Sequence, residues 1–158
     1  ANEAKVQKTD SGRRTKVSGG KSVTIAKYIV DLLKEYGKMQ IDINHVADGS
    51  DKYGLFRSPN RSIQEHNDGS YEVTEGYQFF VRQSTVSPSE RMEVDEFLEE
   101  LTYWADDLGT IYEFPQIDGN RRILGMEITG NPYPMETDSK DTLYQISLTI
   151  TYEREREV

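Results

Sequence analysis

The longest regular pattern of apolar and polar positions in the chain lies between Ser87 and Gly109. Seven apolar residues recur there at spacings of three and four, which place them on one face of a helix: Val94, Phe97, Leu98, Leu101, Trp104, Ala105 and Leu108. Ser87, Pro88 and Glu90 supply a capping box with proline at the first helical position, and Gly109 suits a left-handed stop. The pattern predicts a helix of about five or six turns, with Trp104 at the centre of the core.

The opposite face of this helix is acidic, with Met92 and Tyr103 among its carboxylates. The acids are Glu93, Asp95, Glu96, Glu99, Glu100, Asp106 and Asp107. Asp106 and Asp107 fall in the last turn, where the helix dipole disfavours negative charge by about 0.3 kcal/mol or more each. An aromatic residue inside an unfavourable charge cluster indicates a surface that faces a partner. The alternative is a plain solvated face.

The first half of the chain predicts a shorter helix, a strand and a hairpin. A helix is predicted to begin near Ser22 or Thr24 and to run to Tyr36, and alternation over residues 39–43 predicts a strand. Residues 45–60 are expected to form a loop, because turn-forming residues surround a single apolar island, Tyr53-Gly54-Leu55-Phe56. Asp68-Gly69 then predicts a tight turn with two positive-φ positions between a short strand, 61–66, and a long one, 71–83.

Two more strands are predicted after the long helix. The first alternates through Leu124, Met126 and Ile128 and is expected to break at Gly130-Asn131-Pro132-Tyr133-Pro134. The last runs from Tyr144 to Tyr152 with one apolar and one hydroxyl-rich face, which is typical of an antiparallel sheet. The elements together predict an α+β fold, in which a mostly antiparallel sheet packs against two α-helices in a single domain of residues 23–158.

Composition and charge set residues 1–22 apart from this domain. They carry a net charge of +4, whereas the rest of the 158-residue chain carries −13. Their polar, basic composition predicts an arm that is disordered in the isolated protein and becomes ordered only in an assembly. Arg13, Arg14 and Lys16 are the candidate contacts of this arm with an acidic surface, including that of a neighbouring copy. A solubilising tail is the alternative.

The charge of the domain, the lack of long apolar runs and the absence of cysteine argue against several classes of function. An acidic body argues against a broad nucleic-acid surface. No apolar run is long enough to cross a membrane, and the first residues lack the apolar segment of a signal peptide. The absence of cysteine excludes disulfides and thiolate metal sites and fits an intracellular site of synthesis.

No residue pattern predicts catalysis. His45 and His66 have no positioned partner in the sequence, and no serine lies in a nucleophile elbow. Gly20-Lys21-Ser22 is not a phosphate-binding loop, because Thr15 occupies the position of the required glycine. The acids of residues 48–51 lack the spacing of an EF-hand and indicate a turn. We therefore expect a protein that is not an enzyme and has no catalytic, cofactor-binding or metal-binding residues.

Four features of the chain resemble the tail terminator proteins of long-tailed bacteriophages, which are often described as minor capsid proteins. The first is the opening helix over 25–36 with its short strand, and the second is Tyr53-Gly54-Leu55-Phe56-Arg57-Ser58-Pro59 with the Asp68-Gly69 hairpin and the strand Tyr77-Gln78-Phe79-Phe80-Val81. The third is the helix that ends in Leu101-Thr102-Tyr103-Trp104. The fourth is the turn Ser139-Lys140-Asp141 before the final strand. The resemblance covers about residues 23–153. The basic arm departs from it, since a minimal terminator does not need one.

This resemblance implies a structural role. Such proteins form a hexameric ring on the last ring of the tail tube, stop its growth and present a surface to the head connector or stopper protein. DNA passes through the ring without sequence-specific binding. The resemblance therefore implies a protein of the virion tail or neck, made in the host bacterial cytoplasm. Another head-tail connector or neck protein, and an unrelated α+β binding module or enzyme, remain alternatives.

The cations of the domain are the candidate ring contacts. The candidates are Arg57, Arg61, Arg121, Arg122 and Arg154, some of which are predicted to bridge adjacent copies, or a copy and the tube. Tyr103 is predicted to lie in an interface. Part of the acidic surface would face the DNA channel, where like charges repel within a Debye length of roughly 8–10 Å. The alternative is that all these charges are merely solvated.

Overall fold

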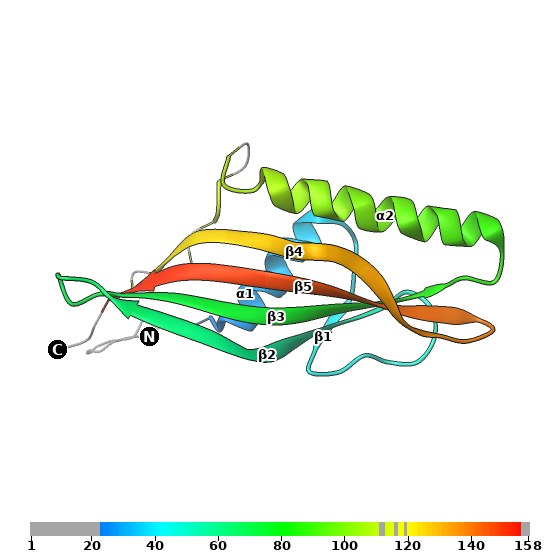
Figure 1. The fold of residues 1–158 in the computed structure, drawn as a ribbon, viewed down its shortest axis with the longest axis horizontal. Coiled ribbons are helices and arrows are strands. Elements are labelled where there is room, and N and C mark those ends of the chain that lie inside the picture. Colours follow the sequence, from blue (N-terminus) through cyan, green and yellow to red (C-terminus); the bar gives the residue numbers. More distant parts are fainter. Residues whose placement is uncertain (1–22, 111–112, 116, 119, 156–158) are drawn as a thin grey trace, which may run out of the picture.

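The computed structural model describes residues 23–110, 113–115, 117–118 and 120–155, and within them it contains two helices and five strands (Figure 1). Their order is α1 (Ile25–Tyr36), β1 (Ile41–Ile43), β2 (Lys52–Glu65), β3 (Tyr71–Ser84), α2 (Pro88–Asp107), β4 (Arg121–Thr137) and β5 (Asp141–Arg154). The predicted contacts of Arg13, Arg14 and Lys16 lie outside the described residues.

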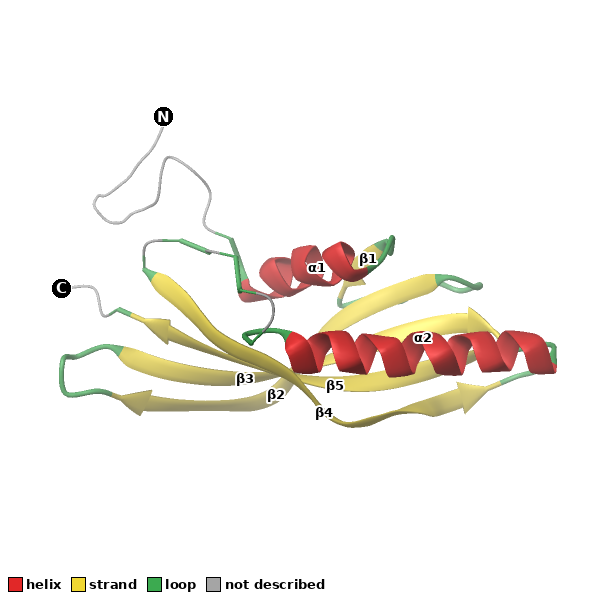
Figure 2. Cartoon of the chain, turned by 90° about the horizontal axis from the view of Figure 1, so that it is seen from above, coloured by secondary structure: helices red, strands yellow, loops and turns green. Residues whose placement is uncertain are grey.

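The strands form one sheet in the order β1-β2-β3-β5-β4. All pairings are antiparallel except that of β1 with β2, which is parallel. Figure 1 looks onto the open face of the sheet, with α1 behind the strands and α2 along the β4 side, and Figure 2 shows the same elements from above. Buried residues of both helices join those of one sheet face in a single core. The predicted α+β class is confirmed.

Both helices begin as the sequence predicts, because their start signals are local. The hydroxyl of Thr24 accepts the backbone N–H of Lys27 at the start of α1. At the start of α2, Ser87 and Glu90 exchange the two hydrogen bonds of a capping box. Beyond α2, Gly109 has a φ of +85°, the left-handed conformation expected there.

The centre of the core differs from the prediction. Trp104 is only partly buried and packs at the edge, with its ring centroid 5.3 Å from that of Tyr36. The fully buried large side chains include Leu101 of α2 and Tyr77 and Phe79 of β3. The prediction was wrong because the inner stripe of α2 meets the sheet through Val94, Leu98, Leu101 and Ala105, which leaves the tryptophan beside it.

The predicted loop over residues 45–60 is partly wrong, because β2 already begins at Lys52 and is 14 residues long. The apolar island is the part of β2 that pairs with β1 on one side and β3 on the other. A side chain at Gly54 would place its Cβ 2.3 Å from the carbonyl oxygen of His45. This glycine therefore marks a close backbone approach inside a strand, which resembles a turn signal in the sequence.

The predicted break at residues 130–134 is also wrong. Strand β4 continues to Thr137, and its register with β5 shifts between Thr129 and Tyr133 and again between Pro134 and Glu136. Prolines are tolerated there because β4 is an edge strand, where a missing N–H can face outward. An earlier shift, between Ile123 and Gly125, exposes Leu124, which was predicted to share a face with Met126.

The β2–β3 turn has the predicted location but not the predicted conformation. Only Gly69 has a positive φ, at +90°, instead of both Asp68 and Gly69. The N–H of Gly69 donates to the carbonyl of His66, while the side chain of Asp68 accepts hydrogen bonds from the backbone and hydroxyl of Ser70. The turn thus uses one glycine and an aspartate side chain.

Candidate interface at the hairpin end of the sheet

The sheet register brings four of the five predicted arginines to one end of the molecule. We call this end, formed by residues 61–75, 120–126 and 150–154, the hairpin end. Glu65, Tyr71, Arg154 and Arg121 pair in succession across β2, β3, β5 and β4, and the neighbouring row is Gln64, Glu72, Glu153 and Arg122. Arg61 lies a few residues away on β2. These residues are distant in sequence, so only the sheet places them together.

Arg121 is mainly an internal contact. Its side chain is 15% exposed, and its Nε and one terminal nitrogen donate to the carboxylate of Asp118 at 3.1 and 2.7 Å. The same terminal nitrogen donates to the carbonyl of Val23. Arg121 therefore ties the residue before α1 to the start of β4. Its predicted interface role stays a prediction, but its removal would also disturb the fold.

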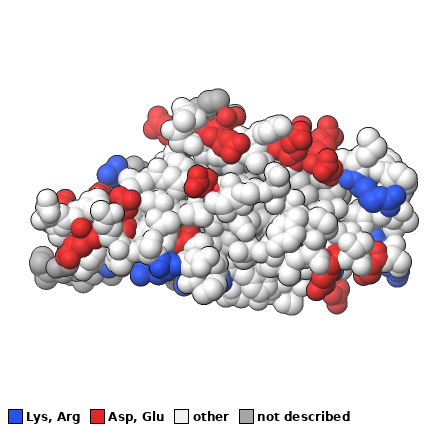
Figure 3. Space-filling view, viewed as in Figure 1, with Lys and Arg blue, Asp and Glu red and all other residues white. Residues whose placement is uncertain are grey.

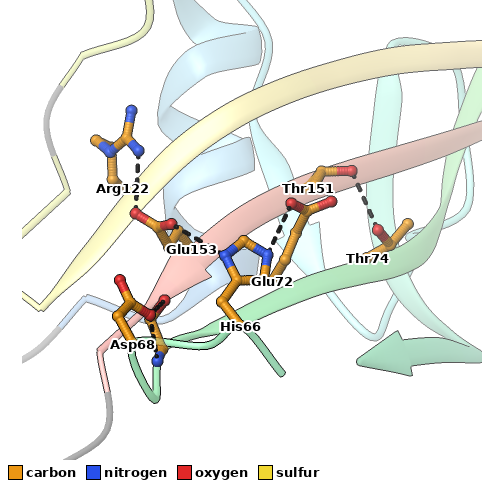
Figure 4. A network of polar contacts seen from close by, with 8 residues as sticks. His66, Asp68, Glu72, Thr74, Arg122, Thr151 and Glu153 are labelled. Carbon is orange, nitrogen blue, oxygen red and sulfur yellow. Dashed lines mark hydrogen bonds and ion pairs between the residues drawn. The ribbon is translucent and has the colours of Figure 1, made fainter. Parts of the chain in front are cut away.

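The side chain of Arg122 is 63% exposed, which is more than the side chains of Arg61 and Arg121. One of its terminal nitrogens lies 3.0 Å from Oε1 of Glu153 (Figure 4). Oε2 of Glu153 lies 3.8 Å from Nδ1 of His66, whose Nε2 lies 3.5 Å from Glu72. The histidine ring thus stands between carboxylates of β3 and β5, and Arg122 extends the row to β4. The hairpin end is held by polar contacts across three strands.

A second polar group lies on the helix-facing side of the same end, around Glu75. The hydroxyls of Tyr77 and Tyr152 donate to its two carboxylate oxygens at 3.0 and 2.8 Å, and Nε of Arg61 donates at 3.2 Å. Burial raises the pKa of Tyr77 to about 12, and burial followed by the hydrogen bond to Glu75 raises the pKa of Tyr152. The carboxylate is therefore fully engaged in structural contacts.

The remaining predicted residues are held differently. The Arg154 guanidinium lies 4.9 Å from the centroid of the Tyr71 ring at the hairpin end. Arg57 lies further along β2, 5.7 Å from the centroid of the Tyr77 ring. Tyr103 lies on α2, away from the arginines, and is 57% exposed. The negative charge of Glu99 is the main cause that raises the pKa of Tyr103.

The charged side chains described at the hairpin end form ion pairs and hydrogen bonds with one another. In the described residues, no three His, Asp or Glu side chains are placed to hold one metal ion. His66 directs its two nitrogens at the carboxylates of Glu72 and Glu153. Two exposed apolar side chains flank the charges, Ile63 on β2 at 49% and Leu124 on β4 at 38%. Arginine is enriched in protein–protein interfaces, and their rims are polar, so the arginines of the hairpin end are compatible with a contact of this kind.

Sequence reasoning missed His66 with its carboxylates and the contacts of Glu75. A signal for Glu75 exists, because it is the one charged residue in the apolar alternation Val73, Glu75, Tyr77, Phe79 and Val81. A carboxylate on a buried strand face requires hydrogen-bond donors. No comparable signal exists for His66, since its partners come from β3 and β5 through the sheet register.

Comparison with known proteins gives no family for the chain. No protein-family model matches it, and a search of curated proteins finds no significant match. None of the described helices is both long enough and apolar enough to span a bilayer.

Proposed function

We propose that the protein is a structural component of a phage virion, of the tail-terminator type. In this proposal, copies close into a hexameric ring on the end of the tail tube, stop its polymerisation and join the tube to the head connector. DNA crosses the ring without sequence-specific binding, and the protein has no catalytic role. The sequence pattern described above supports the family, and one structural observation supports the ring, namely that the sheet has two unlike open edges.

The first open edge belongs to β2. Strand β1 pairs only with Tyr53–Leu55, so in the described part of the chain no strand lies beside the outer side of residues 56–65. The second open edge is β4, which pairs with β5 alone. Unpaired N–H and C=O groups along an edge can pair with another chain. The two edges lie on opposite sides of the sheet.

Copies arranged side by side would meet in an antiparallel sense. Three antiparallel pairings separate β2 from β4, so these two edge strands run in opposite directions. A contact between β4 of one copy and β2 of the next uses two different surfaces, and such a head-to-tail contact closes into a ring when the rotation between copies permits it. The arginines of the hairpin end would border this contact.

The proposal is tested by tail capping and by two edge variants. Wild-type protein added to growing tail tubes should appear in electron micrographs as a ring on one tube end and should limit tube length. Ile63→Asp and Leu124→Asp each place a charge on one open edge at an exposed side chain, so they should fold but fail to form rings. Val86→Asp is the matched control, since Val86 is 63% exposed and lies in neither edge strand.

The results of these experiments distinguish a failure of the terminator role from a failure of the proposed edge contact. Wild-type protein that neither caps tubes nor limits their length would contradict the terminator role. Rings that form normally from both edge variants would contradict the edge contact and leave the role itself intact. Arg122→Glu is preferable to a variant of Arg121 as a test of the arginines, because Arg121 also holds Val23 and Asp118.

A further inference from the structure

The outer face of α2 is unpartnered within the described residues. Met92, Glu96, Glu99 and Tyr103 follow one another at steps of four, three and four, so they form a stripe along this face. Met92 is 74% exposed and Tyr103 is 57% exposed. Figure 3 shows acidic side chains gathered over α2. The face therefore combines an apolar residue and an aromatic residue with a continuous run of carboxylates.

The negative charge of α2 is not balanced by described neighbours. Residues 88–107 contain eight acids and one base, Arg91, which donates to the carbonyls of Thr85 and Val86. No α2 carboxylate forms an ion pair within the part of the chain that the structure describes. The last turn holds Asp106 and Asp107 without a basic residue. The charge of Glu99 and, more weakly, of Asp106 raises the pKa of Tyr103, as expected in a negative field.

The segment of opposite charge starts close to one end of α2. Residues 1–22 carry six cations and two acids, and they are followed directly by Val23, whose carbonyl accepts a hydrogen bond from Arg121. Tyr28, one turn into α1, donates to the carbonyl of Pro115 at 2.8 Å. Pro115 lies in the connection that follows the C-terminal end of α2, and Arg121 is the first residue of β4, where this connection ends. The basic segment is therefore tethered beside the acidic helix.

The reach of this segment matches the length of the helix. Nine residues separate Arg14 from Val23, and an extended chain of that length spans about 30 Å. Helix α2 has 20 residues and is about 30 Å long. The cations at positions 13, 14 and 16 can thus reach the C-terminal part of the outer face, and Arg13 and Arg14 reach further along it than Lys16. Because the arm and the helix belong to one chain, the effective concentration of the arm at the helix is in the millimolar range expected for a short flexible linker. Weak ion pairs therefore suffice to keep the arm on the helix.

We propose that residues 1–22 dock on the acidic outer face of α2 of their own chain, with Arg13, Arg14 and Lys16 among the carboxylates. The arm composition provides cations but few apolar side chains, so the contact is electrostatic and needs no fold of the arm itself. The docked arm covers Met92 and Tyr103, and its net charge of +4 offsets part of the −7 charge of the helix. This proposal concerns the single chain and does not need a ring, so it replaces the expectation that the arm becomes ordered only in an assembly.

Energy transfer within the chain tests the proposal directly. The protein has one tryptophan, Trp104 on α2, and no cysteine, so Ser11→Cys accepts a single acceptor dye in the arm. The efficiency of transfer from Trp104 should fall by about half between 10 mM and 1 M salt, because the Debye length shortens from about 30 to about 3 Å. Glu96→Lys with Glu99→Lys should lower the transfer at 10 mM salt to the high-salt level.

A charge-matched double variant and the addition of unlabelled protein serve as controls for this experiment. Glu35→Lys with Glu127→Lys makes the same change of net charge at exposed positions outside α2 and should leave the transfer as in the parent protein. A large excess of unlabelled protein should not reduce the transfer, since the contact lies within one chain. Three results would each overturn the proposal. They are a transfer efficiency that does not change with salt, one that stays the same after reversal of the α2 charges, and one that is lost when unlabelled protein is added. The salt titration of the parent protein needs no variant of α2 and stays decisive if that variant fails to fold.

Discussion

Removal of the Glu75 carboxylate should destabilise the hairpin end strongly. Glu75→Ala leaves the hydroxyls of Tyr77 and Tyr152 without their acceptor, and these residues are only 1% and 5% exposed. An unsatisfied buried hydroxyl costs about 1–3 kcal/mol, so the two together should lower the free energy of unfolding by about 2–6 kcal/mol. The exposed Arg61 adds little, because ion pairs near the surface contribute about 0–1 kcal/mol.

Urea unfolding followed by circular dichroism measures this loss, and a double-mutant cycle assigns it to the hydroxyls. In a Tyr77→Phe, Tyr152→Phe background no hydroxyl can be left unpaired, so Glu75→Ala should cost at least about 1 kcal/mol less than in the parent protein. Glu72→Ala is the control, since its carboxylate is 37% exposed and contacts His66. Equal costs of Glu75→Ala in both backgrounds would refute the reasoning.

Two further predictions concern the backbone and the tyrosines. Gly54→Ala should lower the free energy of unfolding by more than about 1 kcal/mol, because the new Cβ would overlap the carbonyl of His45. Gly37→Ala, whose Cβ would meet nothing within 4 Å, is its control, and equal urea midpoints would contradict the prediction. Burial raises the pKa of Tyr28 and Tyr77 from 10.0 to about 12, so the unfolded chain loses these protons first and stability should fall as pH rises from 10 to 12. Tyrosinate absorbance that rises in the folded protein as in free tyrosine would contradict it.

Helices, the hairpin and the two core strands β3 and β5 could be predicted because their signals are local. The capping box of α2 lies within four consecutive residues, and the alternation of β5 follows from one buried face. The position of Trp104 could not be predicted in this way. Periodicity places a residue on a helical face, but only the approach of the sheet decides which part of that face is buried.

The edge strands β2 and β4 were harder to predict from the sequence because their residues carry weak strand signals. Residues 59–65 of β2 are exposed, so no burial pattern marks them. Strand β4 contains three register shifts, which place consecutive apolar residues on different faces and hide the alternation. The candidate interface depends on both strands, and its arginines therefore converge only in the folded sheet.

The irregularities of β4 also indicate which part of this edge could pair with another copy. Two of its three register shifts and both of its prolines lie between Thr129 and Glu136. Proline has no N–H to donate, and bulges twist an edge away from a neighbouring strand. The first half of β4 has neither proline and only one register shift, between Ile123 and Gly125. It shares its rows with residues 61–65 on the opposite edge. The usable parts of both edges therefore lie at the hairpin end.

This asymmetry gives a final prediction for the proposed ring. Met135, in the second half of β4, is 49% exposed, and Leu124, in the first half, is 38% exposed. If copies join through the hairpin end, Leu124→Asp should prevent ring formation, whereas Met135→Asp should leave it intact because the half of β4 with both prolines and two of the three register shifts stays outside the contact. Light scattering and electron micrographs of both variants measure this difference. Rings lost in the Met135 variant and kept in the Leu124 variant would place the contact at the other end of the sheet.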